Sequence, residues 1–213
     1  PLQAVELAVP EPEPGQVRLR VGACGICRTD LHLLDGEVRI AHPPRVLGHQ
    51  IVGTTDDGRR YGVPWLGWTD GECAYCRSGR ENLCVNGRFT GKDIDGGYAE
   101  YAVADERYVF DLPESMSDLE VAPLLCGGLI GHRALRLAGD GERLGLYGFG
   151  SSAHIICQVA VHEGRRVFAF TRAEESGSSL LAGNQPLPTG EEIGRQFEQF
   201  LAGLDKPDNP TDN

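Results

Sequence analysis

The sequence reads Cys24-Gly25-Ile26-Cys27-Arg28-Thr29-Asp30-Leu31-His32 near one end, and these nine residues carry two thiols, a hydroxyl, a carboxylate and an imidazole. Thiolates and imidazoles bind zinc tightly, and a hydroxyl close to such a site can pass a proton. Cysteines at the end of a strand also occur as ordinary buried residues without any metal. The stretch alone therefore leaves a zinc site and a packing role open.

Three further signals decide between them: Gly48-His49-Gln50-Ile51-Val52-Gly53, a run of cysteines from Cys73 to Cys84, and Cys126 in a glycine-rich apolar setting. In the order of these motifs and in their residues, the sequence resembles the zinc-dependent alcohol dehydrogenases of the medium-chain dehydrogenase/reductase superfamily. It resembles most of all the branch related to cinnamyl alcohol dehydrogenase. The resemblance extends to about residue 175. It implies mixed α and β structure, with a GroES-like β-rich domain followed by a partial Rossmann α/β unit.

Residues 1–137 are expected to form the GroES-like catalytic domain. Apolar residues alternate in 16–21, and β-branched and aromatic residues punctuated by glycine fill 46–63 and 97–110, so these ranges predict strands. Ser117 is a candidate helix N-cap because Glu120 follows three residues later. Apolar residues then continue at helical spacing, which predicts one helix over 121–137.

Residues 138–175 are expected to form an incomplete Rossmann unit. They predict a strand, a helix and a second strand, over 143–147, 153–162 and 166–170, which is one βαβ unit. Residues 176–213 have no family resemblance and predict one amphipathic helix, about 191–201, before a polar end that we expect to be disordered. The nicotinamide half of the dinucleotide domain is not recognisable, so the chain reads as truncated or joined to unrelated material.

Composition narrows the choice of partners. The 213 residues carry a formal net charge of −11, and an acidic surface repels phosphates, so we expect neither nucleic acid nor an anionic membrane as a partner. No run of about 18 apolar residues predicts a membrane span, and no basic and apolar leader precedes the first strand. Seven cysteines clustered at two-residue gaps suit metal binding in a reducing compartment, which places the protein in the cytoplasm.

The family resemblance implies a catalytic zinc held by Cys27, His49 and Cys126, with a fourth position open for water or substrate. The ligand in the family motif is the cysteine directly before Arg-Thr-Asp, so Cys24 is left as a small buried thiol. Asp30 resembles the carboxylate that orients a ligating imidazole. Many relatives have glutamate after the ligand histidine, and Gln50 stands in that place here, which removes one negative charge from the site.

The same resemblance assigns a proton relay to Thr29 and His32, leading from an alcohol bound at zinc to solvent. The other interpretation is a buried threonine beside a surface histidine.

A second, structural zinc is predicted from the spacing C-x2-C-x7-C of Cys73, Cys76 and Cys84. Asp70 stands where a further thiolate would complete the set, and a carboxylate oxygen also binds zinc. Closely spaced ligands on one loop suit a closed site without catalytic function. The alternative is a loop that has lost its metal and keeps free thiols.

A nucleotide-binding turn is predicted at Gly148-Phe149-Gly150-Ser151-Ser152-Ala153, which fits G-x-G-x-x-A between a strand and a helix. Gly148, Gly150, Ser151 and Ala153 would bring backbone amides close to a pyrophosphate. Arg172 lies where NAD-dependent proteins carry an acidic residue, and it favours NADP over NAD. Glu174 and Glu175 nearby keep NAD open.

Together these assignments indicate hydride transfer between a small primary alcohol or aldehyde and NAD(P). A different class of function is a zinc-stabilised domain remnant that binds metal and turns over nothing. A quinone reductase shares the fold and the nucleotide turn, but the full set of zinc ligands disfavours it. The family also implies oligomers for full-length relatives.

Overall fold

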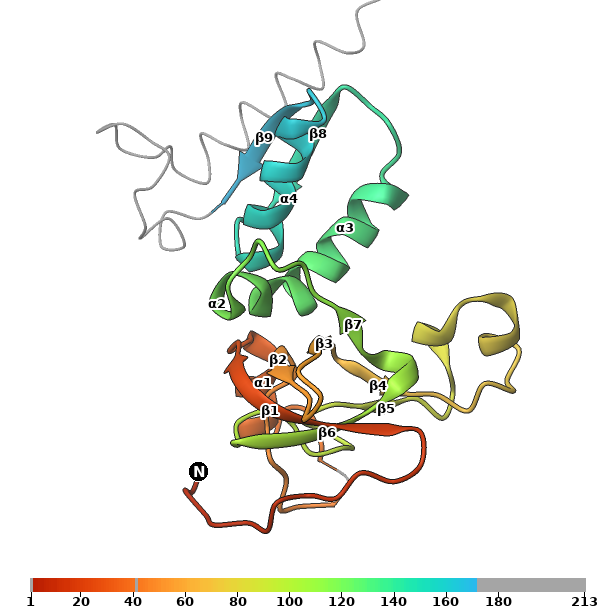
Figure 1. The fold of residues 1–213 in the computed structure, drawn as a ribbon. Helices are drawn as coiled ribbons and strands as arrows, with labels where there is room; N and C mark the ends of the chain where they lie inside the picture. The colour runs from red at the N-terminus through yellow and green to blue at the C-terminus, as the bar shows by residue number, and fades with distance from the viewer. Residues whose placement is uncertain (1, 41, 172–213) are drawn as a thin grey trace, which may run out of the picture. The chain divides into compact units, whose positions relative to one another are not determined.

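A computed structural model describes residues 2–40 and 42–171 of the chain (Figure 1). These residues fall into two compact units, one extending to Arg133 and one beginning at Ala134. The helix expected over 191–201 and the polar end lie outside the described residues. Among the helices of the described part, none is long and apolar enough to cross a membrane.

The first unit is built on a five-stranded antiparallel sheet with the strand order β6-β1-β2-β3-β7. Its strands are β1 (Gln16–Cys24), β2 (Ile51–Thr54), β3 (Arg60–Val63), β6 (Tyr101–Asp105) and β7 (Phe110–Asp111). The strands expected within 16–21, 46–63 and 97–110 are therefore confirmed. The mixed α and β fold class is confirmed as well.

Alternation along β1 places its apolar side chains on one face of the sheet. Leu19 is fully buried, with Val17 and Val21 packed partly against the same core, while Arg18 and Arg20 project from the other face. The strand continues three residues beyond the alternating segment, with an irregular register between Val21 and Ala23. It therefore delivers the chain directly to the Cys24–His32 stretch, whose second half forms helix α1 (Arg28–Leu34).

Short elements surround the sheet. A two-stranded sheet pairs β4 (Leu66–Trp68) with β5 (Arg88–Phe89), and the loop between these strands carries the cysteine run on two 3-10 turns, η1 (Cys76–Ser78) and η2 (Glu81–Leu83). A third 3-10 turn, η3 (Glu106–Tyr108), lies between β6 and β7. The cysteine loop projects from the unit as a separate lobe in Figure 1.

The helix expected over 121–137 is broken in two, which corrects that prediction. Its cap is as expected, because the Ser117 backbone N–H donates to Glu120 Oε2 at 2.8 Å. After α2 (Asp118–Val121) and the 3-10 turn η4 (Ala122–Leu125), however, Cys126 leaves helical geometry with φ −131° and ψ −70°. A new helix, α3 (Gly127–Leu137), then begins. Pro123 lacks an N–H and glycines are poor helix formers, so the residues on both sides of Cys126 weaken a continuous helix.

The second unit contains the expected βαβ arrangement, with β8 (Arg143–Tyr147), α4 (Ser151–His162) and β9 (Arg166–Phe170). The two strands are parallel, and Arg143 is in register with Arg166. Helix α4 begins two residues earlier than predicted, directly after Gly150. Leu135, Ile156 and Ala160 form the buried core of this unit, and apolar residues of both strands pack against it.

Candidate active site and metal centres

Three segments that lie far apart in the sequence bring Cys27, His49 and Cys126 together. Cys27 is the N-cap of α1 directly after β1, His49 precedes β2, and Cys126 occupies the break between η4 and α3. The ligand atoms of the three side chains all lie within 4.8 Å of one another. The helix break is therefore what turns the Cys126 side chain toward the other two.

The cluster fits a zinc ion. Two thiolates bound about 2.3 Å from a tetrahedral zinc lie about 3.8 Å apart, and Cys27 Sγ and Cys126 Sγ are 3.9 Å apart. His49 Nδ1 is hydrogen-bonded to Asp30 Oδ1 at 3.0 Å, while its buried Nε2 has no hydrogen-bond partner among the described residues. A buried nitrogen without a partner is unfavourable unless a ligand meets it. Three ligands leave one tetrahedral position open.

Asp30 serves two of these ligands at once. The side chain is 3% exposed, its Oδ1 faces His49, and its Oδ2 accepts the Cys27 backbone N–H at 2.8 Å. Burial raises the pKa of Asp30, but hydrogen bonds from His49 and from the Cys27 backbone lower it further than burial raises it. Burial likewise lowers the pKa of His49, yet Asp30 and Cys27 outweigh that effect and raise it to about 9.

The two thiols differ in protonation in the absence of metal. The pKa of Cys27 is lowered to about 3, first by the hydrogen bond from Cys126 and then by His49. The pKa of Cys126 is raised, first because its proton is held by the Cys27 sulfur and second because it is buried. Cys24 lies outside the cluster, packs against the sheet core, and has a pKa raised to about 11, mainly by burial.

Thr29 and His32 lie three residues apart on α1, which places them on the same face of the helix. Thr29 Oγ1 is hydrogen-bonded to Cys27 Sγ at 3.7 Å. His32 is partly exposed, and its Nδ1 is paired with Glu37 Oε2. A hydroxyl beside the Cys27 sulfur and a partly exposed imidazole are therefore on one side of this helix.

The structure adds an aromatic neighbour of His49 that the sequence patterns did not single out. Trp65 meets the His49 ring edge-on at a centroid distance of 4.9 Å and stacks on Phe89 at 5.1 Å. Gln50, the residue noted for replacing a glutamate, is 5% exposed. Trp65 belongs to an apolar run that reads as ordinary strand sequence, so its place beside His49 had no signal in the sequence.

A second cluster lies in the lobe between β4 and β5. Asp70, Cys73, Cys76 and Cys84 bring their ligand atoms within 4.8 Å of one another, and Cys73 Sγ is 3.5 Å from Cys76 Sγ. Four ligands complete a tetrahedral site without an open position, which is the arrangement of structural zinc. Because Cys73, Cys76 and Cys84 lie on one short loop, a metal bound here would hold the lobe together.

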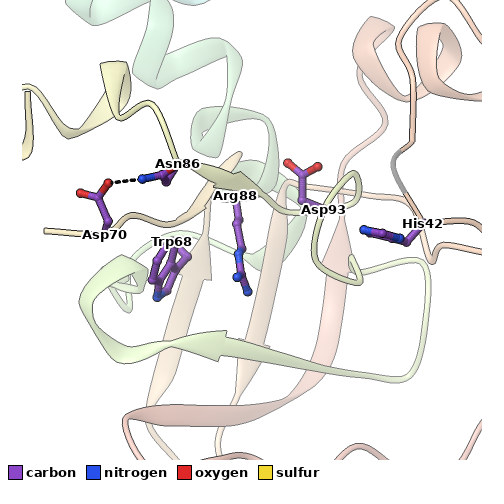
Figure 2. A pocket seen from close by; sticks show the side chains of 7 residues that line it. His42, Trp68, Asp70, Asn86, Arg88 and Asp93 are labelled. Atoms are coloured by element: carbon purple, nitrogen blue, oxygen red, sulfur yellow. Dashed lines mark hydrogen bonds between the residues drawn. The ribbon is translucent and has the colours of Figure 1, made fainter. Parts of the chain in front are cut away.

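The Asp70 carboxylate is held in place for such a role. Its Oδ1 accepts backbone N–H groups from Glu72 at 2.9 Å and from Cys73 at 3.0 Å, and its Oδ2 accepts the Asn86 amide at 2.7 Å (Figure 2). These hydrogen bonds, with the Cys73 backbone first, lower the pKa of Asp70, so the group is a carboxylate at neutral pH.

A pocket of about 640 Å³ adjoins this second cluster and not the Cys27 cluster. Its wall includes Trp68 and Arg88, whose guanidinium lies 4.8 Å from the centre of the Trp68 ring (Figure 2). The other lining residues are His42, Asp70, Asn86, Gly87 and Asp93.

The predicted nucleotide turn joins β8 to α4. Gly148 has a φ of +85°, and its N–H donates to the Phe170 carbonyl at 2.7 Å. Gly150 is the N-cap, Ser151 is the first residue of α4, and Ala153 lies in its first turn. A side chain at Gly148 or Gly150 would meet no atom of the described residues within 4 Å. Arg172 lies outside the described residues.

Comparisons with known proteins identify the class. Residues 13–114 match the alcohol dehydrogenase GroES-like domain. The chain is 45% identical over 199 residues to a probable alcohol dehydrogenase, AdhA, of Mycobacterium tuberculosis, covering 85% of this chain and 57% of that protein. Among solved structures it is similar to a cinnamyl alcohol dehydrogenase of Sorghum bicolor, with 28% identity, a TM-score of 0.70, and coverage of 78% of this chain and 53% of that chain.

A second solved structure, CAD from Helicobacter pylori complexed with NADP(H), has 28% identity and a TM-score of 0.70, over 76% of this chain and 52% of that chain. The chain therefore belongs to the alcohol dehydrogenases of the medium-chain dehydrogenase/reductase superfamily, as its motifs predicted. It spans about half the length of these relatives.

Proposed function

We propose that the protein acts as a zinc-dependent alcohol dehydrogenase, which transfers hydride between a small primary alcohol or aldehyde and NAD(P). The observation that carries the proposal is the cluster of Cys27, His49 and Cys126, with its 3.9 Å sulfur separation and its unpaired His49 Nε2. An acidic surface and the family relationship both favour a small organic substrate over a nucleic acid.

In this mechanism, zinc and a nicotinamide cofactor, when bound, supply Lewis-acid chemistry and a hydride acceptor. Cys27, His49 and Cys126 would hold the metal, and Asp30 keeps His49 in the tautomer that leaves Nε2 free. Thr29 would receive the hydroxyl proton of the alcohol, and His32 would release it to solvent. Trp65 would form an apolar wall beside the substrate, because its ring already lies against His49.

The remaining assignments support this function. Asp70, Cys73, Cys76 and Cys84 would hold a structural zinc that stabilises the lobe. Gly148, Gly150, Ser151 and Ala153 would cradle the cofactor pyrophosphate, and Arg172 together with the NADP(H) complex of one relative favours NADP over NAD. All seven cysteines are free, which suits metal-binding thiolates in a reducing compartment such as the cytoplasm.

The test measures zinc, cofactor and turnover on the same protein. Elemental analysis is expected to find two zinc ions per chain, one for each cluster, and Cys126→Ser should lower this number to one. Cys157→Ser is the matched control, because Cys157 belongs to neither cluster. Binding of NADPH and of NADH is measured by fluorescence titration. Oxidation of the bound cofactor on addition of an aldehyde is expected to disappear in Cys126→Ser.

The outcomes separate the proposal from its alternative. Two zinc ions without cofactor binding would favour a zinc-stabilised domain that turns over nothing. Absence of zinc from the purified chain would overturn both metal assignments. Turnover that survives Cys126→Ser would overturn the catalytic role of the first cluster.

A further inference from the structure

His32 lies in the last turn of α1, and the chain that follows this helix turns back toward it. The Asp35 N–H donates to the Leu31 carbonyl at 2.8 Å, and Gly36 follows with a φ of +80°. Glycine adopts this left-handed conformation without the steric penalty that other residues incur, which is why it commonly ends helices. The helix therefore ends, and the chain reverses, directly before Glu37.

The reversed chain contacts His32 at two points. The Val38 N–H donates to the His32 backbone carbonyl at 3.1 Å, so the residue directly after Glu37 is held beside the histidine. The Glu37 side chain is paired with the His32 ring, through Oε2 and Nδ1. Because the backbone hydrogen bond already places Glu37, less conformational entropy is lost when the two side chains pair.

The chemistry of the two groups sets the direction of this hydrogen bond. A carboxylate can only accept, so the Nδ1 atom of His32 carries the proton that it shares with Glu37. A neutral imidazole has one N–H and one unprotonated nitrogen. Protonation at Nδ1 therefore leaves Nε2 of His32 as the nitrogen that can accept a proton.

A proton relay through His32 requires this form of the ring. A histidine that receives a proton at Nε2 must hold its other proton at Nδ1, and the ring is an imidazolium until the proton leaves. A carboxylate at Nδ1 fixes that tautomer and stabilises the imidazolium, as the aspartate does for the histidine of Ser-His-Asp hydrolases. The Nε2 proton then passes to a solvent base, and the ring returns to its starting form.

We propose that Glu37 is a positioning residue of the proton relay, which holds His32 with Nδ1 protonated so that Nε2 accepts the proton arriving by way of Thr29. The inference rests on the proposed dehydrogenase function and deepens it, since the sequence motifs gave Glu37 no role. Glu37 belongs to neither metal cluster, and it acts through His32 alone.

The first test reads the tautomer of His32 by nuclear magnetic resonance. The nitrogen chemical shifts of the ring distinguish an N–H from an unprotonated nitrogen, and His32→Gln identifies the signals of His32. The full chain, loaded with zinc, is measured at about pH 8.5, well above the usual pKa of histidine. We expect the Nδ1–H form to predominate in the unmodified chain. The ratio of the Nδ1–H form to the Nε2–H form should fall about fivefold in Glu37→Ala, the upper end for an exposed ion pair.

Glu114→Ala is the matched control. Glu114 is an exposed glutamate whose side chain makes no hydrogen bond or ion pair within residues 2–40 and 42–171. Its removal takes away the same charge as Glu37→Ala and leaves the His32 pair intact. We expect it to leave the tautomer ratio unchanged.

The second test measures alcohol oxidation in a single turnover, so that product release does not mask the proton transfer. The rate in Glu37→Ala should fall about threefold to fivefold, because an exposed ion pair stabilises the imidazolium by no more than this factor. KM should stay unchanged, since the carboxylate acts on the proton transfer and not on substrate binding.

The outcomes separate the role of Glu37 from the proposed function. An unchanged tautomer ratio in Glu37→Ala, or a predominant Nε2–H form in the unmodified chain, would overturn the role of Glu37 and leave the zinc site intact. A changed ratio with an unchanged single-turnover rate would overturn the role in the relay. An unmodified chain that holds zinc and turns over nothing would overturn the dehydrogenase function, and the relay with it, whatever the tautomer ratio.

Discussion

Among single residues, protonation prepares the proposed zinc site unevenly. Cys27 is already a thiolate at neutral pH, since its pKa is about 3, whereas His49 and Cys126 have raised pKa values and hold their protons in the metal-free protein. A metal ion binds only the deprotonated forms of these side chains. Zinc must therefore displace two protons, one from His49 and one from Cys126.

Zinc affinity at this cluster should consequently rise with pH. Both groups lose their protons more easily as the pH increases toward their raised pKa values, and each displaced proton contributes about a tenfold change per pH unit. Between pH 6 and pH 7 the apparent affinity is expected to rise about a hundredfold. Competition with a chelator of known protonation measures this affinity. The same measurement on Cys126→Ser gives the zinc bound by the cluster in the lobe, which is then subtracted.

Release of about two protons per zinc ion into weakly buffered solution at pH 7 is the independent check, because the displaced protons are counted directly. An affinity that stays constant between pH 6 and pH 8 would contradict the assignment of the protonated forms.

At the level of elements, irregular backbone places the candidate metal ligands. Regular strands end at Cys24 and begin at Ile51, so Cys27 and His49 lie just outside them, and Cys126 lies where two helical segments are separated. Backbone hydrogen bonds that join residues 96–98 to residues 46–48 hold the segment directly before His49. The sheet supplies a rigid base, and its ends and interruptions supply the site.

Gly48→Ala tests the contact between the Tyr98 ring and the Gly48 backbone, with a matched glycine as the control. Gly48 and Gly58 both have positive φ, +93° and +87°, but a Cβ at Gly58 would meet no atom of the described residues within 4 Å, whereas one at Gly48 would collide with Tyr98 and Cys24. We expect Gly58→Ala to cost about 1 kcal/mol from backbone strain, and Gly48→Ala about 1–3 kcal/mol more from overpacking. Denaturant unfolding measures both free energies.

Equal losses of stability in these two variants would show that the contact between Tyr98 and Gly48 gives way without cost. The Tyr98 ring would then not fix the backbone at Gly48.

For the whole molecule, both metal clusters belong to the unit that ends at Arg133, and this unit contains the match to the GroES-like domain. Its buried apolar residues form two modest groups around the main sheet. Metal that binds the folded form and not the unfolded chain adds directly to the free energy of unfolding.

Removal of zinc by a chelator should therefore lower the melting temperature. A metal present at about 100 times its Kd stabilises by about 2.7 kcal/mol per site, and a chain of this size shifts by about 2–4 °C per kcal/mol. A decrease of about 5–10 °C for each site is expected in a thermal melt. Added zinc should restore the original value and added magnesium should not, because magnesium prefers oxygen ligands. An unchanged melting temperature after complete zinc loss would contradict a structural role for zinc in the lobe.

Much of the fold could be predicted because the relevant signals are local. Alternation in β1, the Ser117–Glu120 cap and the apolar strands on either side of α4 each occupy a few consecutive residues, and each forms as expected. The helix over 121–137 was wrong because apolar spacing continues through Cys126 although the backbone does not. Periodicity records which residues are apolar and carries no information on where a helix is interrupted.

The sequence by itself determined the chemistry of this protein: which thiols, imidazoles and carboxylates are available, and which short spacings allow them to share a loop, as Cys73 and Cys76 do. The family resemblance grouped Cys27, His49 and Cys126 and assigned Asp30 to the imidazole, but only the tertiary structure decided how close they come. It also decided that Asp30 accepts the Cys27 N–H and that Tyr98 lies over Gly48. The physical reason is the short distance along the chain over which a spacing pattern acts. Spacing along the chain constrains neighbours within a few residues, whereas contacts between distant segments depend on how the sheet and the helix break pack together.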